Sequence, residues 1–185
     1  AGELEEIVSE SIEGVSRIET IVQALKGTAR RRDEKVRFDC SRAIQEAITI
    51  FKGAKKSECE ILAVISLLPE VVGSPSALGQ VMLNLMQNGL DAMSVVERKQ
   101  RKLEVRASVE GERVRVTVRD HGTGIPTDVQ QRMWDAFYTT KDVGKGTGLG
   151  LSICKEIVEE MGGWLEFETG PTGTAFHLLL PEAAE

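Results

Sequence analysis

The sequence predicts an α+β fold in which helices cover one face of a mixed β-sheet. The first observation is a pair of hairpins. Apolar residues alternate over 103–109 and 114–118 around the turn "EGE", and "WLEFE" and "TAFHLLL" flank the turn "GPTG". The second observation is that strands and helices otherwise alternate along the chain. Since hairpins pair antiparallel strands, the sheet is expected to be mixed.

Local signals give each element its bounds. Ser41 is expected to cap the first helix and Gly53 to close it, while Pro75 stands in the first turn of the long helix. Gly162 and Gly163 are expected to end the last helix. In chain order we expect strands at 35–39, 59–67, 70–73, 103–109, 114–118, 164–168 and 174–180, and helices at 41–54, 74–93, 127–134 and 149–161.

A separate helix is predicted over residues 4–25. Its apolar stripe follows a heptad-like spacing with one polar interruption, at Leu4, Val8, Ser11, Val15, Ile18, Val22 and Leu25, widened by Ile7, Ile12 and Ile21. A stripe of this width favours a helical bundle or dimer over the alternative, an amphipathic helix lying on its own domain. Gly27 and "RRRDEK" interrupt the pattern. We therefore expect two regions, 1–32 and 33–185.

Composition restricts the function. The net charge is −6 over 185 residues, which argues against a dedicated nucleic-acid binder because no basic excess exists to displace phosphate counterions. No apolar run approaches the ~20 residues of a membrane span, and "AGELEEIVSE" does not read as a signal peptide. Cys40, Cys59 and Cys154 are odd in number and far apart, so we expect reduced cytosolic thiols without a metal.

Three polar residues share one face of the long helix. Asn84, Asn88 and Asp91 follow one another by about one turn, opposite an apolar stripe that belongs in a core, namely Leu78, Met82, Leu85, Met86 and Met93. Amide and carboxylate oxygens on one face can help to hold Mg²⁺, which takes phosphate oxygens for its other positions. Taken alone, the pattern fits a solvated helix face better.

The stretch "DHGTGIP" follows the second strand of the first hairpin. Asp120 could accept a hydrogen bond from an exocyclic amine such as that of adenine, and Gly122 and Gly124 would let a flat ring approach the backbone. Taken alone, this stretch fits a β-turn better.

A glycine-rich loop, expected to be mobile over 137–147, precedes the last helix. In "FYTTKDVGKGTGLGLSI" glycines alternate at 144, 146, 148 and 150. Backbone N–H groups at such a helix start bind phosphate. No apolar strand precedes the loop, as a Rossmann fingerprint requires. Lys145 is followed by Gly146 instead of Ser or Thr, so the loop is not a Walker A motif either.

The order and spacing of these motifs resemble the ATP-binding catalytic domain of sensor histidine kinases, which has the Bergerat (GHKL) ATPase fold. The resemblance covers about 33–181, and "NLMQNGLDAM" and "FYTTKDVGKGTGLGLSI" are most similar to the nitrogen- and dicarboxylate-sensing branch. The helix over 4–25 resembles the second helix of that family's dimerisation hairpin.

The resemblance implies a role for each matching residue. Asp120 would bond adenine, Asn88 would bind Mg²⁺, and Asn84 would lie beside the phosphates. Lys141 and Lys145 would contact phosphates, with Asn84 and Lys141 as the catalytic candidates, and Phe137 would pack the base of a lid. The remaining nucleotide-binding candidates are Asp91, Gly122, Gly124, Ile125, Thr140, Gly146, Thr147, Gly148, Leu149 and Gly150.

The resemblance also implies partners. ATP or ADP with Mg²⁺, a phosphoacceptor histidine hairpin, a response regulator receiver domain and a homodimer through 4–25 are expected. The location is expected to be cytoplasmic, as the cytoplasmic portion of a membrane-bound sensor or otherwise.

The sequence departs from the family in four respects. Gly89 replaces the usual Ala, His121 the usual Asn and Ala136 the usual Pro. We expect His121 to act behind the site and not in catalysis. The family's acceptor motif, similar to His-Glu-Leu, is not found in these 185 residues. We therefore expect the catalytic piece of a histidine kinase that receives its acceptor from elsewhere.

Three other functions stay open: a hydrolase of the same fold, an anti-sigma-type serine kinase, and a nucleotide-sensing module with an inert site. The first two commonly carry a glutamate base one turn before the Mg²⁺ asparagine. Asn84 stands there, and an amide cannot accept a proton at neutral pH. The intact set of motifs argues against an inert site.

Overall fold

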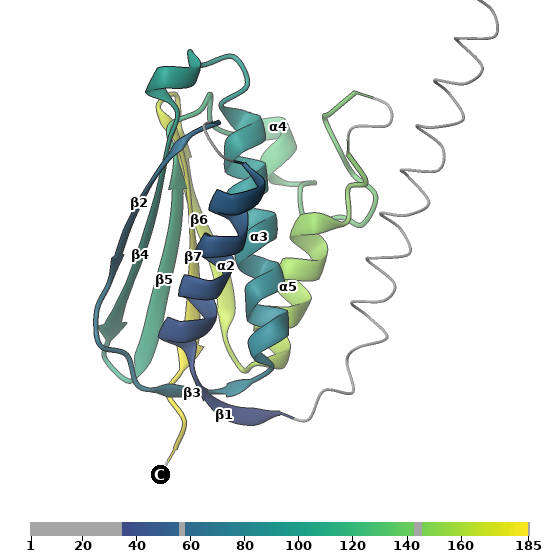
Figure 1. Ribbon diagram of the computed structural model, residues 1–185. Helices are drawn as coiled ribbons and strands as arrows, with labels where there is room; N and C mark the ends of the chain where they lie inside the picture. The colour runs from purple at the N-terminus through teal and green to yellow at the C-terminus, as the bar shows by residue number, and fades with distance from the viewer. Residues whose placement is uncertain (1–34, 56–57, 143–145, 185) are drawn as a thin grey trace, which may run out of the picture.

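The computed structural model describes residues 35–55, 58–142 and 146–184, and the helix predicted over 4–25 and the expected boundary lie outside these residues. The long helices lie side by side on one face of a five-stranded sheet (Figure 1). The predicted α+β class with helices on one face is confirmed. The elements, in chain order, are β1 Val36–Asp39, α2 Cys40–Ala54, β2 Glu60–Ile65, β3 Glu70–Gly73, α3 Pro75–Ala92, the 3-10 helix η2 Arg98–Gln100, β4 Lys102–Glu110, β5 Arg113–Asp120, α4 Thr127–Gln130, α5 Gly150–Glu160, β6 Trp164–Gly170 and β7 Gly173–Pro181.

The sheet is mixed, as predicted. Its strand order is β2-β4-β5-β7-β6, in which only the β2–β4 pair is parallel. Both predicted hairpins, β4–β5 and β6–β7, are present. The short strands β1 and β3 form a separate antiparallel pair. The hairpins place the end of β5 at the centre of the sheet, next to the turn between β6 and β7.

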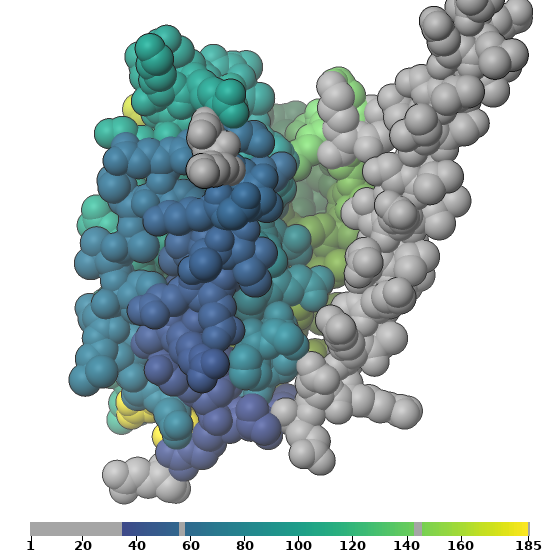
Figure 2. Space-filling model, in the orientation of Figure 1, coloured from purple at the N-terminus to yellow at the C-terminus, as the bar shows by residue number. Residues whose placement is uncertain are grey.

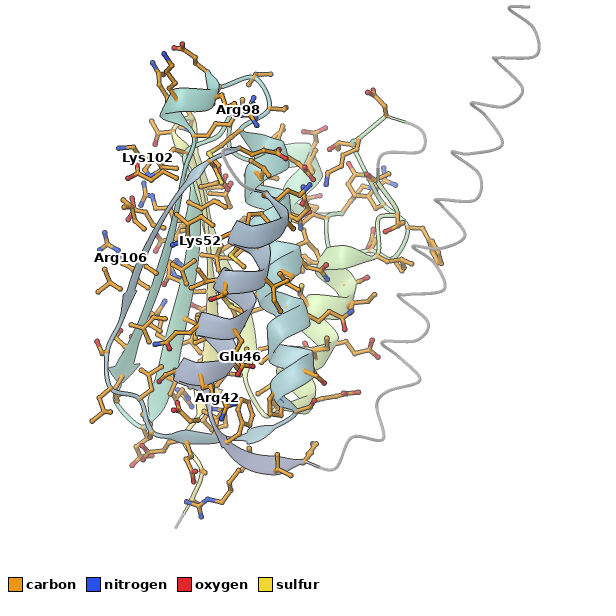
Figure 3. All side chains as sticks on the ribbon, viewed as in Figure 1. Arg42, Glu46, Lys52, Arg98, Lys102 and Arg106 are labelled. Atoms are coloured by element: carbon orange, nitrogen blue, oxygen red, sulfur yellow. The ribbon has the colours of Figure 1, made fainter. Side chains whose placement is uncertain are left out.

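The core lies between the sheet and the helices. Alternate residues of β5 face inward and pair with inward residues of β7, as Val116 does with Leu178 and Val118 with Phe176. The apolar stripe predicted on the long helix covers them, and its five members are all buried. The other face of the sheet is polar, and Lys102 and Arg106 of β4 point away from the helices there (Figure 3). The core therefore fixes which face of α3 remains free to form a site.

Two predicted helix ends were wrong. Asp39, not Ser41, caps α2, because its Oδ1 accepts a hydrogen bond from the Ser41 N–H at 2.8 Å. The other end of this helix agrees with the predicted range, since α2 ends at Ala54, directly after Gly53. The helix predicted over 127–134 ends at Gln130, and turns follow it. In those turns the ring of Trp134 packs 6.0 Å from Phe167 and 6.3 Å from Phe176, so tertiary contacts there replace the helix.

The helices cover the sheet as a continuous surface. Side chains of α2 and β2, in blue, occupy most of the face shown in Figure 2, and the green surface of α5 lies beside them. None of the helices in the described part of the chain is long and apolar enough to span a membrane.

Candidate nucleotide site

The polar face of α3 is directed toward α5. Asn84 lies beside the thiol of Cys154 on α5, which donates to the carbonyl of Val81 at 3.9 Å; burial raises the pKa of that thiol to about 12, and Asn84 acts in the opposite direction. A Cβ added at Gly150 would stand 4.0 Å from Nδ2 of Asn88. The helix therefore presents its polar residues to the start of α5. The sequence did not predict this neighbour of Asn84, whose place beside the phosphates stays a prediction.

A single ammonium group joins α3 to the loop that precedes α5. Nζ of Lys141 donates to Oδ2 of Asp91 at 2.5 Å and to Oδ1 of Asn88 at 3.4 Å. The other oxygen of Asp91 accepts from Nε2 of Gln87 at 2.7 Å. An amide oxygen and a carboxylate therefore converge on one cation, which is the kind of oxygen set that suits Mg²⁺ when phosphates supply the other ligands.

Asp120 ends β5 at the other end of the site. It is only 4% exposed, and its Oδ1 accepts from the N–H groups of Gly122 at 2.8 Å and Thr174 at 3.2 Å. Burial raises the pKa of this carboxyl group, and the two hydrogen bonds oppose the shift. Among the described residues both bonds to the Asp120 side chain end on Oδ1. Oδ2 accepts neither of these bonds, and the expected bond from adenine to Asp120 stays a prediction.

The glycines after Asp120 are required for a reason other than the predicted one. A Cβ at Gly122 would lie 2.6 Å from the carbonyl oxygen of Ala92 at the end of α3. A Cβ at Gly124, which has a φ of +73°, would overlap the carbonyl of Gly170 at the end of β6. The space without a side chain is occupied by the protein's own backbone. The glycines therefore let the loop fit between α3 and the hairpin, and their contact with a ring stays a prediction.

Two threonines that the sequence analysis missed hold this loop. Oγ1 of Thr169 accepts from the Ile125 N–H at 2.8 Å and lies 3.0 Å from Oγ1 of Thr174. The N–H of Thr174 in turn bonds Asp120. Their only signal in the sequence was the hairpin itself, whose register places Ala175 opposite Arg119 and so brings Thr174 to the end of β5.

The glycine-rich loop folds back on the residues that begin it. The N–H of Phe137 donates to the carbonyl of Gly148 at 3.0 Å, and Gly148 has a φ of +66°. A Cβ at Gly146 would lie 2.6 Å from Oγ1 of Thr139, beside the side chain of Lys141. The loop therefore comes close to its own base through backbone contacts, for which only glycine leaves room.

The far end of the loop leads into α5. The N–H of Leu149 donates to Oγ1 of Thr147 at 3.4 Å, just before the helix begins at Gly150. The first N–H groups of a helix have no partner within the helix and favour anions. Thr140 is exposed on the same loop, and Lys145 lies outside the described residues. The start of α5 stands beside the polar face of α3 and can receive phosphate there.

Phe137 differs from expectation. Its side chain is 70% exposed and its φ is +68°, which is rare for a residue other than glycine. The expected packing of the ring at the lid base is wrong for this structure, because the backbone of Phe137, and not its ring, contacts Gly148.

Both histidines bond side chains on the outer face of the sheet, away from the helices. Nε2 of His121 lies 2.9 Å from Oε1 of Glu104, and this bond holds the pKa of Glu104 below its ordinary value. His177 lies on the outer face of β7, where Nδ1 is 2.9 Å from Oγ1 of Thr117. His121 therefore follows Asp120 in the chain, but its ring is turned toward Glu104 on the outer face, where His177 also lies.

Fold and site together define a nucleotide-binding domain. A buried carboxylate lies at one end, and an oxygen cluster with a lysine and a helix start lies at the other. The family model described as histidine kinase-, DNA gyrase B-, and HSP90-like ATPase matches residues 73–184, which is more than half of the chain.

Curated relatives agree with this match. The C4-dicarboxylate transport sensor protein DctB of Rhizobium meliloti (strain 1021) is 39% identical over 114 residues, which are 62% of this chain and 18% of the relative. The sensor histidine kinase TmoS of Ectopseudomonas mendocina is 30% identical, over 97% of this chain and 19% of its own length. The chain thus spans about a fifth of these relatives.

Solved structures share the fold. The catalytic domain of histidine kinase ThkA in a nucleotide-free form superposes with a TM-score of 0.70 at 28% identity, covering 80% of this chain and 96% of that one. ThkA in complex with response regulator protein TrrA gives a TM-score of 0.73 at 24% identity, over 97% of this chain and 52% of that one.

The chain belongs to the family of histidine kinase-, DNA gyrase B- and HSP90-like ATPases. Within it, the described domain is the ATP-binding catalytic domain of a sensor histidine kinase.

Proposed function

We propose that this chain binds Mg-ATP and transfers the γ-phosphate to a histidine supplied by another segment or chain, from which a response regulator receives it. The observation that carries the proposal is the arrangement of the two ends of the site. At one end, both bonds to Asp120 fall on the same oxygen, and at the other end Lys141 bonds Asn88 and Asp91, with Asn88 beside the start of α5.

Each end has its own task in this proposal. Oδ2 of Asp120 accepts the adenine amine, which fixes the nucleotide at the end of β5. Oδ1 of Asn88 binds Mg²⁺, and the backbone N–H groups from Gly146 to Gly150 bind the phosphates together with Lys141. Lys145, which lies on the same loop in the sequence, is a further phosphate ligand.

The acceptor needs little activation from the protein. A histidine imidazole is a nucleophile in its neutral form, so the site needs no carboxylate base beside the phosphates. Asn84 supplies none, and its amide lies beside the thiol of Cys154. The site is therefore suited to hold ATP beside an imidazole and poorly suited to activate water.

The relatives support the proposed partners. ThkA has been solved with response regulator protein TrrA, which supports a response regulator as the final acceptor here. We propose that residues 4–25 form the second helix of a dimerisation hairpin and that 33–185 form the catalytic domain. We also propose that the domain works in the cytoplasm.

The central test is phosphorylation in trans. The chain is mixed with labelled ATP and a separately prepared acceptor hairpin of its own kinase. Acid-labile, base-stable label should appear on the hairpin and not on this chain. Label on this chain alone would contradict the proposal, and His121 would then be the first residue to replace.

Hydrolysis separates the kinase from a hydrolase of the same fold. The unmodified chain should hydrolyse ATP slowly, and Asn84→Glu should raise the rate because a carboxylate can accept a proton from water. Efficient hydrolysis by the unmodified chain would favour the hydrolase.

A further inference from the structure

Asp91 is held by protein groups on both of its oxygens. Gln87, one turn earlier on α3, donates to Oδ1 at 2.7 Å, and Lys141 donates to Oδ2 at 2.5 Å. The side chain is 35% exposed, as is that of Lys141. Asp91 is therefore engaged on both sides without being buried, which is unlike a carboxylate waiting for a metal ion or a nucleotide.

Lys141 also contacts the oxygen proposed to bind Mg²⁺. Its Nζ lies 3.4 Å from Oδ1 of Asn88. Two cations repel each other at one amide oxygen, so the ammonium group must leave Asn88 when Mg²⁺ arrives. An ammonium group has three donors, and it can release Asn88 while it keeps Asp91.

We propose that Asp91 is a positioning residue for Lys141. It keeps the ammonium group beside the metal position, ready to exchange the oxygen of Asn88 for a phosphate oxygen of the nucleotide. Asp91 itself binds neither nucleotide nor metal, which replaces the expectation drawn from the sequence. The inference rests on the proposed function, because it assumes that Mg-ATP occupies this site.

The position of Lys141 on a loop explains why its side chain needs to be held by Asp91. Lys141 lies in a segment without helix or strand, and its neighbour Gly146 has no side chain to hold it. A lysine on such a loop has many rotamers, and ordering it on phosphate costs conformational entropy. The ion pair with Asp91 restricts the side chain before the nucleotide binds, while Gln87 orients the carboxylate.

A double-mutant cycle with calorimetry tests the coupling. The affinities of Mg-ATP and Mg-ADP are measured for the full 185-residue chain, Asp91→Asn, Lys141→Met and the double variant. Each single variant should lose roughly tenfold in Mg-ATP affinity, the scale of one charge-assisted hydrogen bond. The double variant should bind no more weakly than Lys141→Met. Independent losses that multiply in the double variant would overturn the proposal.

The Mg²⁺ requirement distinguishes positioning from ligation. The Mg²⁺ concentration that half-saturates ATP binding should be the same in Asp91→Asn as in the unmodified chain. A higher requirement would show that Asp91 is a metal ligand and overturn the proposal. Asp91→Glu keeps the charge and should recover most of the lost ATP affinity.

Control measurements distinguish a failure of the positioning role from a failure of the proposed function. Lys155→Met removes one partner of another partly exposed ion pair, Lys155–Glu159 on α5, and should leave ATP affinity unchanged. Each variant should show the melting transition of the unmodified chain. If the unmodified chain binds no Mg-ATP, the proposed function fails. If it binds and the Asp91 and Lys141 effects are independent, only the positioning role fails.

Discussion

The backbone N–H of Thr174 donates to Oδ1 of Asp120 at 3.2 Å across 54 residues of sequence. This bond joins the end of β5 to the hairpin that completes the sheet. Together with the bond from Gly122 it satisfies one carboxylate oxygen, and the proposed site uses the other for adenine.

Asp120→Asn should weaken nucleotide binding without unfolding the domain. The amide keeps an oxygen that can accept from Gly122 and Thr174, but its NH₂ group would then face the adenine amine, donor against donor. The affinity for Mg-ATP should fall by about 1–3 kcal/mol in calorimetry. Asp128→Asn, an exposed acid on α4, is the matched control and should have no effect. Unchanged ATP affinity in Asp120→Asn would remove the adenine assignment.

The raised pKa of Asp120 predicts a pH dependence. The ionised form binds adenine, so ATP affinity should fall on acidification at a pH above the ~3.9 of an ordinary aspartate. Stability should respond in the opposite direction. Because the folded-state pKa exceeds the unfolded value, the folded state binds more protons between the two, and this group adds stability as the pH falls through that window. Affinity and melting temperature measured against pH, with Asp120→Asn as the reference, test both signs. An affinity profile equal to that of the variant would contradict the prediction.

Gly124→Ala should destabilise the domain and weaken ATP binding together. The residue has a φ of +73°, and its added Cβ would overlap the carbonyl of Gly170. The strain should cost about 1–3 kcal/mol of unfolding free energy in denaturant titration. Gly53→Ala serves as the control, because its Cβ would meet nothing within 4 Å near the end of α2. That change should stabilise by about 0.5–1 kcal/mol. A neutral Gly124→Ala would show that the loop is not held as described.

Close packing around Gly89 explains why glycine stands there, although alanine is the better helix former. A Cβ there would lie 2.7 Å from Cδ2 of Leu103 and 3.1 Å from Cβ of Asp120. Gly89→Ala should therefore destabilise by about 1–3 kcal/mol through overpacking, despite the better helix former. Leu103→Val should reduce that penalty in the double variant, and chemical denaturation of all three variants measures the coupling. A stabilising Gly89→Ala would mean that the Leu103 side chain moves aside freely.

The buried faces of strands and helices could be predicted from patterns that repeat along the chain, whereas the hydrogen-bond partners of single residues could not. The alternation around Val116 and the stripe through Met82 and Met86 revealed the inner faces, because burial imposes a period of two on strands and about 3.6 on helices. The order of the motifs identified the domain. The cap at Asp39 was missed because Ser41 is an equally good capping residue by type. Local chemistry did not decide between them.

Contacts between distant segments were even harder to predict from the sequence. Nothing in the spacing of Lys141 and Asp91 indicates that they meet, since one lies on a loop and the other on α3. Gly122 and Gly124 were noticed, but for a ring and not for the carbonyls of Ala92 and Gly170. A glycine shows that something comes close, and only the folded chain shows what does.

The β6–β7 turn also determines when the nucleotide site can form during synthesis of the chain. Thr169, Gly170 and Thr174 supply the contacts that hold the loop after Asp120, and they belong to the last sixth of the sequence. A ribosome delivers Asp120 and the glycine-rich loop earlier than this turn. A nascent chain halted before Thr169 would carry every motif of the nucleotide site and still lack the turn that holds the loop after Asp120. Its affinity for ATP should therefore arise only when the final hairpin has emerged.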